Sequence, residues 1–175
     1  MTDSRRLFFA LWPDEHIRQQ LHAAARQHRP HQSRAIPRTN LHATLIFLGT
    51  VPTTLMPVIT GAAANVRVRS LQLSLQLLEV WRRPQVLCLC PANIPDALQQ
   101  MHDELAAALQ AAAVKFDQRA YRPHVTLARK VRRRMQHEQL AQPIVWSVSA
   151  FSLVESVSTD RGVRYEPLRQ WRVST

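Results

Sequence analysis

Cysteine is scarce in this chain, because 175 residues contain only two, Cys88 and Cys90. Their i, i+2 spacing in a Val-Leu-Cys-Leu-Cys run places both on one face of a predicted strand. A disulfide requires a demanding geometry, so we interpret both as small packing residues and predict no bridge between them. This cysteine usage gives no indication of an oxidising compartment.

Long apolar runs are also missing. The apolar run at the N-terminus ends at Trp12, before Pro13-Asp14-Glu15, and is too short for the hydrophobic region of a signal peptide. No other stretch approaches the length of a membrane span. We therefore expect a cytoplasmic protein without a membrane partner.

Acidic residues are few, with 12 Asp and Glu against 23 Lys and Arg, which gives a net charge of +11 at pH 7. Such an excess favours a polyanionic partner, and RNA is the simplest candidate, although a generally basic surface has the same balance. The sequence lacks a dense Asp/Glu/His ligand set, so we expect no metal and no cofactor. Four histidines near the N-terminus have no i, i+4 spacing and are predicted to be solvent-exposed: His16, His22, His28 and His31.

One short motif occurs twice. His42-Ala43-Thr44-Leu45 and His124-Val125-Thr126-Leu127 lie 82 positions apart, about half the chain. Both copies have the apolar and β-branched composition of strands, on which residues i and i+2 share a face. Each copy therefore presents an imidazole beside a hydroxyl. A single copy is typical of a packed or exposed histidine, but two copies indicate a paired functional site.

The remaining pattern predicts the order strand, helix, strand, helix, strand, strand, helix, strand, strand, strand in a single domain covering residues 1–175. Pro13, Pro52 and Pro95 precede or open the three helices, and residues 30–40 read as a loop. A connection is expected at 80–85, and strands are expected at 7–11, 71–77, 86–90, 146–157 and 163–173, in addition to the two motif strands. The helix at Pro95 is expected to leave His102 exposed.

These segments resemble the 2H phosphoesterase superfamily, whose signature is two His-x-Thr/Ser-x motifs. The closest resemblance is to the RNA 2′,3′-cyclic phosphodiesterases, first described as 2′-5′ RNA ligases. The likeness runs nearly end to end, through residues 6–11, 40–49, 123–129, 151–156, 165–168 and Trp171. The strand at 86–91 departs from the family, because Cys88 and Cys90-Pro91 stand where members often carry an aromatic residue and a glycine.

The resemblance implies an α+β fold with two lobes, in which two antiparallel-rich sheets face each other across a central cleft with one motif in each. It implies metal-independent hydrolysis of RNA or nucleotide 2′,3′-cyclic phosphates, with His42 and His124 as acid and base. The local chemistry leaves open which histidine has which role. Thr44 and Thr126 would bind the phosphate by donating hydrogen bonds.

Arg129 would also hold the phosphate on the family pattern, although its odd spacing from His124 requires a bend or bulge in the strand. Four further residues are weaker candidates. Phe47 and Tyr121 could flank a base or ribose, with core packing favoured for Phe47, and Arg132 and Arg133 in the basic run 129–134 could contact an RNA backbone.

Three hypotheses stay open. The chain is an RNA 2′,3′-cyclic phosphodiesterase, or a related phosphodiesterase or ligase acting on 2′-5′ linked oligonucleotides or small cyclic nucleotides, or a non-catalytic RNA-binding module. A monomer is expected in each case. A metal-bound histidine protein is a more distant alternative.

Overall fold

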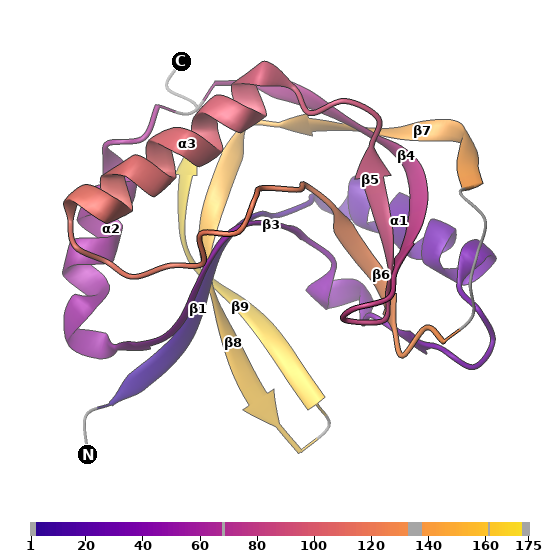
Figure 1. The fold of residues 1–175 in the computed structure, drawn as a ribbon, viewed down its shortest axis with the longest axis horizontal. Helices are drawn as coiled ribbons and strands as arrows, with labels where there is room; N and C mark the ends of the chain where they lie inside the picture. Colours follow the sequence, from indigo (N-terminus) through magenta and orange to yellow (C-terminus); the bar gives the residue numbers. More distant parts are fainter. Residues whose placement is uncertain (1–2, 68, 133–137, 161, 173–175) are drawn as a thin grey trace.

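The computed structural model describes residues 3–67, 69–132, 138–160 and 162–172. Within these ranges three helices cover an antiparallel sheet (Figure 1). The helices are α1 (Glu15–His28), α2 (Met56–Ala64) and α3 (Asp96–Ala111). The strands are β1 (Ser4–Leu11), β2 (Arg34–Ala35), β3 (Ala43–Pro52), β4 (Leu71–Trp81), β5 (Val86–Pro91), β6 (Val125–Arg129), β7 (Glu138–Val148), β8 (Ala150–Thr159) and β9 (Gly162–Arg172).

The sheet has two halves. Its strand order is β7-β4-β5-β6-β3-β1-β8-β9, with β2 paired to the side of β6. We call β7-β4-β5-β6 the His124 half-sheet and β3-β1-β8-β9 the His42 half-sheet. The halves join at a single register pair, where Ala43 of β3 pairs with Val125 of β6. The two expected sheets are therefore halves of one continuous ladder, each with one motif strand at the join.

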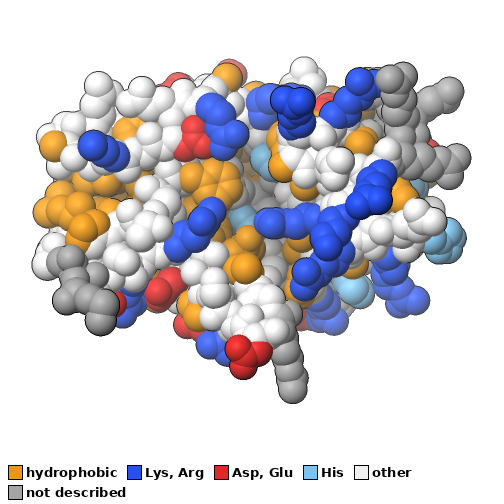
Figure 2. All heavy atoms as spheres, turned by 60° about the horizontal axis from the view of Figure 1, so that its bottom comes forward, with side chains coloured by type: hydrophobic (Ala, Val, Ile, Leu, Met, Phe, Trp, Pro, Cys, Tyr) orange, Lys and Arg blue, Asp and Glu red, His pale blue; other side chains and the backbone are white. Residues whose placement is uncertain are grey.

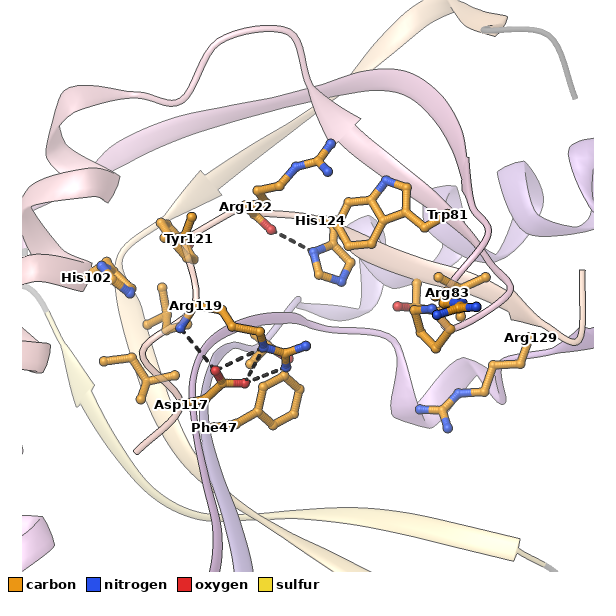
Figure 3. A pocket seen from close by; sticks show the side chains of 17 residues that line it. Phe47, Trp81, Arg83, His102, Asp117, Arg119, Tyr121, Arg122, His124 and Arg129 are labelled. Carbon is orange, nitrogen blue, oxygen red and sulfur yellow. Dashed lines mark hydrogen bonds and ion pairs between the residues drawn. The ribbon is translucent and has the colours of Figure 1, made fainter. Parts of the chain in front are cut away.

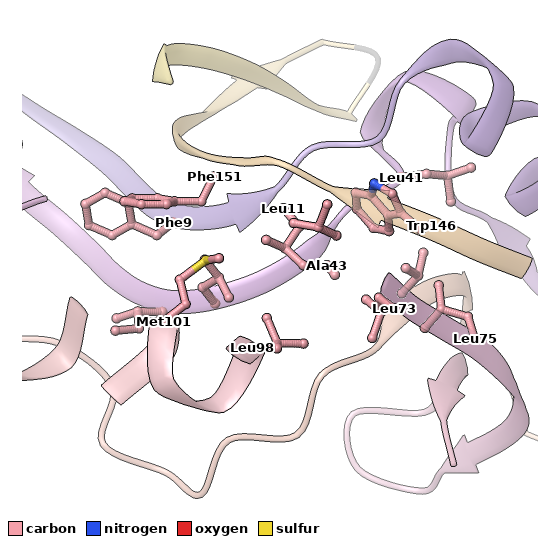
Figure 4. Close-up of a cluster of buried hydrophobic side chains, with 14 of the residues drawn as sticks. Phe9, Leu11, Leu41, Ala43, Leu73, Leu75, Leu98, Met101, Trp146 and Phe151 are labelled. Atoms are coloured by element: carbon pink, nitrogen blue, oxygen red, sulfur yellow. The ribbon is translucent and has the colours of Figure 1, made fainter. Parts of the chain in front are cut away.

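The helices cross between the halves. Helix α1 leads into the His42 motif but packs against β6 and β7 of the other half. Helix α3 leads into the His124 motif but contacts β3 and α2. Figure 4 shows Met101 of α3 beside Phe9, and Leu98 of α3 below Leu11 and Ala43, three residues of the His42 half-sheet. Each half thus buries its apolar face under the helix of the other half.

Local signals explain where the helices begin and which side they bury. Asp14 caps α1 by accepting a 2.8 Å hydrogen bond from the Ile17 amide, and Glu15 places a negative charge at the positive end of the helix. The buried residues of α1 repeat at helical spacing and are Ile17, Leu21, Ala24 and Ala25. In α3 the same spacing buries Leu98, Met101, Leu105 and Leu109. Each fully buried leucine contributes about 1.5–3 kcal/mol relative to an exposed one.

The predicted α+β class is confirmed, and the long elements follow the predicted order except that four strands, and not three, come after α3. Four differences in detail follow. Residues 30–40 contain β2 and a 3-10 turn at Arg38–Asn40, where a loop was expected. Strand β4 continues through Val80 and Trp81, which were assigned to a connection. The predicted strand 146–157 is wrong, because β7 ends at Val148 and β8 begins at Ala150. Strand β7 also starts earlier, at Glu138.

The two cysteines are buried in β5 and are free thiols. They pack with Val86 in a small cluster against Leu77 and Trp81, as expected for packing residues. Burial raises the pKa of Cys90 to about 12 and that of Cys88 still further, so neither thiol ionises near neutral pH.

None of the helices in the described ranges has the length and apolar character needed to cross a membrane.

Candidate active site

The two motifs lie on neighbouring antiparallel strands. Because Ala43 pairs with Val125, the register places His42 beside Thr126 and Thr44 beside His124. All four side chains alternate away from the paired residues, so they share one face of the sheet. The join between the half-sheets therefore carries two imidazoles and two hydroxyls in a diagonal arrangement.

A β-bulge follows the threonine of each motif. In β3, Ile46 and Thr44 pair with the consecutive residues Phe9 and Ala10, so Leu45 is the extra residue. In β6, Ala128 and Thr126 pair with the consecutive residues Leu87 and Cys88, so Leu127 is the extra residue. Both bulged leucines are buried in the core. The repeated leucine after each threonine thus has a structural role that the alternating strand pattern does not predict.

The bulges change which later side chains reach the site. Without a bulge, a residue three positions after the threonine faces the opposite side of the sheet. With it, Phe47 and Arg129, each three positions after its threonine, line the same cavity as Thr44 and Thr126. The bulge that an Arg129 contact requires is present in β6. Phe47 was assigned more readily to the core, but its side chain is 44% exposed.

The same backbone contact orients both histidines. The Nδ1 atom of His42 lies 2.7 Å from the carbonyl oxygen of Asn40, and Nδ1 of His124 lies 2.7 Å from that of Arg122. A carbonyl oxygen only accepts hydrogen bonds, so each Nδ1 must carry the proton and donate it. Each neutral ring therefore leaves Nε2 as its proton-accepting atom.

The two Nε2 atoms differ in their surroundings. Nε2 of His42 lies 3.0 Å from the Thr44 hydroxyl oxygen, which donates to it in the neutral tautomer. Among the described residues, Nε2 of His124 has no corresponding hydrogen bond, and its ring lines the cavity. His42 is not among the lining residues and reaches the cavity through Thr44.

Both imidazoles are held in the neutral form in the free protein. Burial, together with smaller effects of His124, Arg129 and Arg18, lowers the pKa of His42 to about 4, although the hydrogen bond to the Asn40 carbonyl acts in the opposite direction. Burial also lowers the pKa of His124, with an added lowering by Arg122 that Glu79 partly offsets. An anion bound between the rings would act in the opposite direction and favour protonation.

Aromatic rings enclose His42. The ring centroids of Phe8 and Tyr165 lie 4.9 and 5.0 Å away, and Trp12 stacks at 5.9 Å. Asn40 is buried, and its amide bridges this region to β9 by donating to the Val163 carbonyl and accepting from the Tyr165 amide. The residue whose carbonyl orients His42 is thereby fixed to the β9 strand.

A tryptophan and an arginine pack around His124. The Trp81 ring lies 4.3 Å from the His124 ring, and the Arg122 guanidinium lies 4.5 Å from the centre of the Trp81 ring. Figure 3 shows the Trp81 ring and the Arg122 side chain above the imidazole, with the Arg122 carbonyl oxygen joined to it by a dashed line. Trp81 was missed at the sequence level because its strand was predicted to end before it.

A cavity of about 470 Å³ opens beside these groups and is large enough for a nucleotide. Phe47 and the Asp117–Arg119 ion pair lie near one another along it, with Arg83 and Arg129 further along (Figure 3). Lys and Arg side chains border the hollow, and histidine atoms are visible inside it (Figure 2). The lining residues with side chains able to contact an anion or a base are Thr44, Phe47, Trp81, Arg83, His102, Asp117, Arg119, Tyr121, Arg122, His124, Thr126 and Arg129.

The other predicted site residues have mixed outcomes. Tyr121 lines the cavity and stacks on His102, with ring centroids 4.2 Å apart. The expectation that His102 is exposed is wrong, because its side chain is only 16% exposed. Arg132 is exposed and is not among the lining residues, and Arg133 lies outside the described residues.

Arg83, Arg119 and Arg122 also line the cavity although the sequence analysis singled out none of them. They lie on connections between helices and strands, which have no regular periodicity. In a chain rich in arginine, the sequence therefore does not distinguish arginines that line the cavity from those on the surface.

No group of three or more His, Cys, Asp or Glu in the described part of the chain is arranged to hold a metal ion. Among the N-terminal histidines, His16 and His31 are exposed as expected, but His22 and His28 are partly buried. His28 lies 3.4 Å from the Glu138 carboxylate of β7.

Two His-x-Thr strands joined antiparallel in a two-lobed α+β fold define the class of 2H phosphoesterases. The chain belongs to the 2′-5′ RNA ligase superfamily, whose family model matches residues 13–160. It is 28% identical over 175 residues to the RNA 2′,3′-cyclic phosphodiesterase of Escherichia coli strain K12, with 99% of each chain covered.

Solved structures match as well. The crystal structure of E. coli LigT complexed with 3′-AMP has a TM-score of 0.90 at 27% identity, with 99% of this chain and 100% of that chain covered. TT0787 of Thermus thermophilus has a TM-score of 0.81 at 23% identity, with 96% and 97% covered, which is a likeness of fold. The predicted family and fold are therefore confirmed.

Proposed function

We propose that this protein hydrolyses the 2′,3′-cyclic phosphate at RNA ends to a 2′-phosphomonoester, without a metal, by a two-histidine acid–base mechanism. The observation that carries the proposal is the pairing of Ala43 with Val125, which sets both His-x-Thr motifs on one face of adjacent strands. The identity to the E. coli RNA 2′,3′-cyclic phosphodiesterase over 99% of both chains supports this substrate class.

Opening the cyclic ester requires a base for the attacking water, an acid for the departing ribose oxygen and donors for the phosphoryl oxygens. Two imidazoles supply the first two, and each such proton transfer typically contributes about 10²–10⁴-fold. We assign water activation to His124, because its Nε2 faces the cavity without a partner among the described residues. His42 then protonates the leaving 3′ oxygen, and the bond to the 2′ oxygen is kept.

His42 has to take up a proton from solvent when the substrate binds. Its pKa of about 4 leaves the free ring neutral at pH 7. A cyclic phosphate carries one negative charge, and an opposite charge at hydrogen-bonding distance favours the imidazolium form. The hydroxyls of Thr44 and Thr126 and the guanidinium of Arg129 serve as donors to the non-bridging oxygens, where charge increases in the transition state.

The nucleoside of the terminal residue is assigned to the remaining cavity. Phe47 offers an exposed ring for stacking, and Tyr121 lines another part of the same cavity. Arginines around the opening supply the positive field that an RNA chain would follow. The 3′-AMP complex of the E. coli relative agrees with a nucleotide-sized site.

The test is product analysis on an oligonucleotide that ends in a 2′,3′-cyclic phosphate, with and without EDTA. We expect a 2′-phosphate product at the same rate in both. Faster turnover of 2′-5′ linked oligonucleotides or cyclic mononucleotides would favour the related phosphodiesterase or ligase instead. RNA binding without turnover at any pH would favour a binding module, and loss of activity in EDTA would contradict the metal-independent mechanism.

A further inference from the structure

Glu79 is a carboxylate behind the His124 site that no step of the proposed reaction uses. It lies on β4, and its side chain is 20% exposed. Its Oε2 atom accepts hydrogen bonds from Trp81 Nε1 at 2.7 Å and from Arg122 Nη2 at 3.0 Å. Glu79 is not among the residues that line the cavity, so it acts on the site through these two partners.

Both partners of Glu79 contact His124. Trp81 packs its ring against the imidazole, and the Arg122 carbonyl accepts the Nδ1 proton. The Arg122 guanidinium also lies over the Trp81 ring, so the three side chains form one unit with a single carboxylate at its base.

The His42 side is built differently. There too a tryptophan stacks on the imidazole and an arginine lies over it, with Arg18 5.4 Å from the centre of the Trp12 ring. Backbone carbonyls accept the hydrogen bonds of the Arg18 guanidinium, and they belong to Pro13, Arg38 and Thr39.

The carboxylate beside Arg18 is Glu15, which is 3.9 Å away, beyond hydrogen-bonding distance, and 58% exposed. Among the described residues, a carboxylate that accepts from both the tryptophan and the arginine therefore occurs at His124 and not at His42. Glu79 is therefore the difference between the Trp81–Arg122 pair at His124 and the similar Trp12–Arg18 pair at His42.

We propose that Glu79 is a positioning residue of the second motif, where its carboxylate fixes the Trp81–Arg122 pair against His124. The inference is tested by the activity of a variant and by the titration of His124 in the free protein. Only the activity measurement rests on the proposed function, because the titration needs no substrate.

The charge of Glu79 acts on His124 within a basic environment. The Arg122 charge lowers the pKa of His124, and the Glu79 charge raises it. Removing the carboxylate should therefore lower the His124 pKa further and leave His42 unchanged. The charged and titratable groups around the ring are Glu79 and Arg122 beside it and His42 on the neighbouring strand. Further along the cavity they are Arg83, His102, Asp117, Arg119, Tyr121 and Arg129.

The test is Glu79→Gln, which keeps the shape of the side chain and removes its charge. Ring-proton NMR titration of the free protein should show a lower pKa for His124 and an unchanged one for His42. With the cyclic phosphate substrate, kcat should fall about 10-fold, near the lower end for partners that orient a functional histidine. KM should stay within about twofold, because Glu79 does not line the cavity. Glu79→Asp, which keeps the charge, should restore the titration toward wild type.

Glu155→Gln is the matched control. Glu155 is also on a strand, has a side chain 19% exposed, pairs with an arginine and is not among the residues that line the cavity. A His124 pKa in Glu79→Gln equal to wild type, or a kcat no lower than that of Glu155→Gln, overturns the proposal.

A second variant is available if Glu79→Gln does not fold. Trp81→Phe removes the donor to Glu79 and keeps a ring beside His124, and a wild-type kcat in that variant would contradict the proposal. If the wild-type protein hydrolyses none of the cyclic phosphates tested, the proposed function is rejected, but the titration result is unaffected.

Discussion

At the scale of single residues, the site depends on two histidines that each make the same kind of backbone contact. Each ring donates through Nδ1 to the carbonyl two positions earlier, from Asn40 or from Arg122. The repeated His-x-Thr motif identified the residues, because strand alternation alone puts i and i+2 on one face. It did not identify the carbonyl contacts, since these depend on the direction of the backbone in the segment before each strand.

Burial of a neutral His42 predicts a pH-dependent stability. The folded-state pKa of about 4 lies below the unfolded value of 6.5, so the unfolded chain binds a proton more readily between these values. The contribution is present above pH 6.5 and is lost as pH falls toward 4. Between pH 7 and pH 5 it amounts to about 2 kcal/mol of unfolding free energy.

Urea unfolding of wild type and His42→Gln at pH 7 and pH 5 measures this contribution. The wild type should lose about 2 kcal/mol more than the variant over that interval. His31→Gln, at an exposed position, is the control and should follow the wild type. Equal losses in all three proteins would show that His42 is not held neutral.

At the scale of elements, the bulges after Thr44 and Thr126 decide what reaches the cavity. Leu45 and Leu127 enter the core as extra residues, and Phe47 and Arg129 turn to the site. Sequence alternation assigned Arg129 to the wrong face unless the strand was irregular. The motif leucines resemble ordinary strand residues, and a bulge becomes visible only when the partner strand fixes the register.

Asn40 links two elements that are 123 positions apart in sequence, the 3-10 turn before β3 and strand β9. Asn40→Ala removes two part-buried hydrogen bonds to the backbone of β9, and each such bond typically contributes about 0.5–1.5 kcal/mol. It also frees the backbone that orients His42. We expect lower thermal stability and, at a temperature where the variant is folded, kcat/KM reduced about 10-fold or more.

The same substitution at Asn65 is a suitable control, because that side chain is exposed at the end of α2. Thermal unfolding and steady-state kinetics of both variants should separate them clearly. If Asn40→Ala and Asn65→Ala behave alike, the link to β9 has no part in holding His42.

At the scale of the whole molecule, two similar halves join at one residue pair, and the helix that leads into each motif packs against the other half. The sequence predicted the half-chain repeat, the class of fold and the order of the long elements as far as β6, but one strand too few after it. It did not predict that α1 packs under β6 and β7 while α3 packs under the His42 half-sheet. Helical periodicity specifies which face of a helix is apolar, and both half-sheets offer an apolar face of the same kind.

The crossing of the helices ties the fold to the site. Helix α1 precedes the His42 motif but packs on the His124 half-sheet, and α3 precedes the His124 motif but packs on the His42 half-sheet. The halves are therefore expected to fold together and to bring the motif strands into contact. The basic surface around the cavity follows from the +11 charge that the composition already showed. Which arginines face the cavity depended on tertiary structure.

The central claim is that His42 and His124 act together on one phosphate. The most direct test is the hydrolysis rate of a 2′,3′-cyclic phosphate RNA end by wild type, His42→Ala, His124→Ala and the double variant, with His31→Ala as the control. Each single variant should lose about 10²–10⁴-fold in kcat. The double variant should lose much less than the product of the two single losses, because the histidines work as a unit. Wild-type turnover in either single variant, with the control unaffected, would contradict the account.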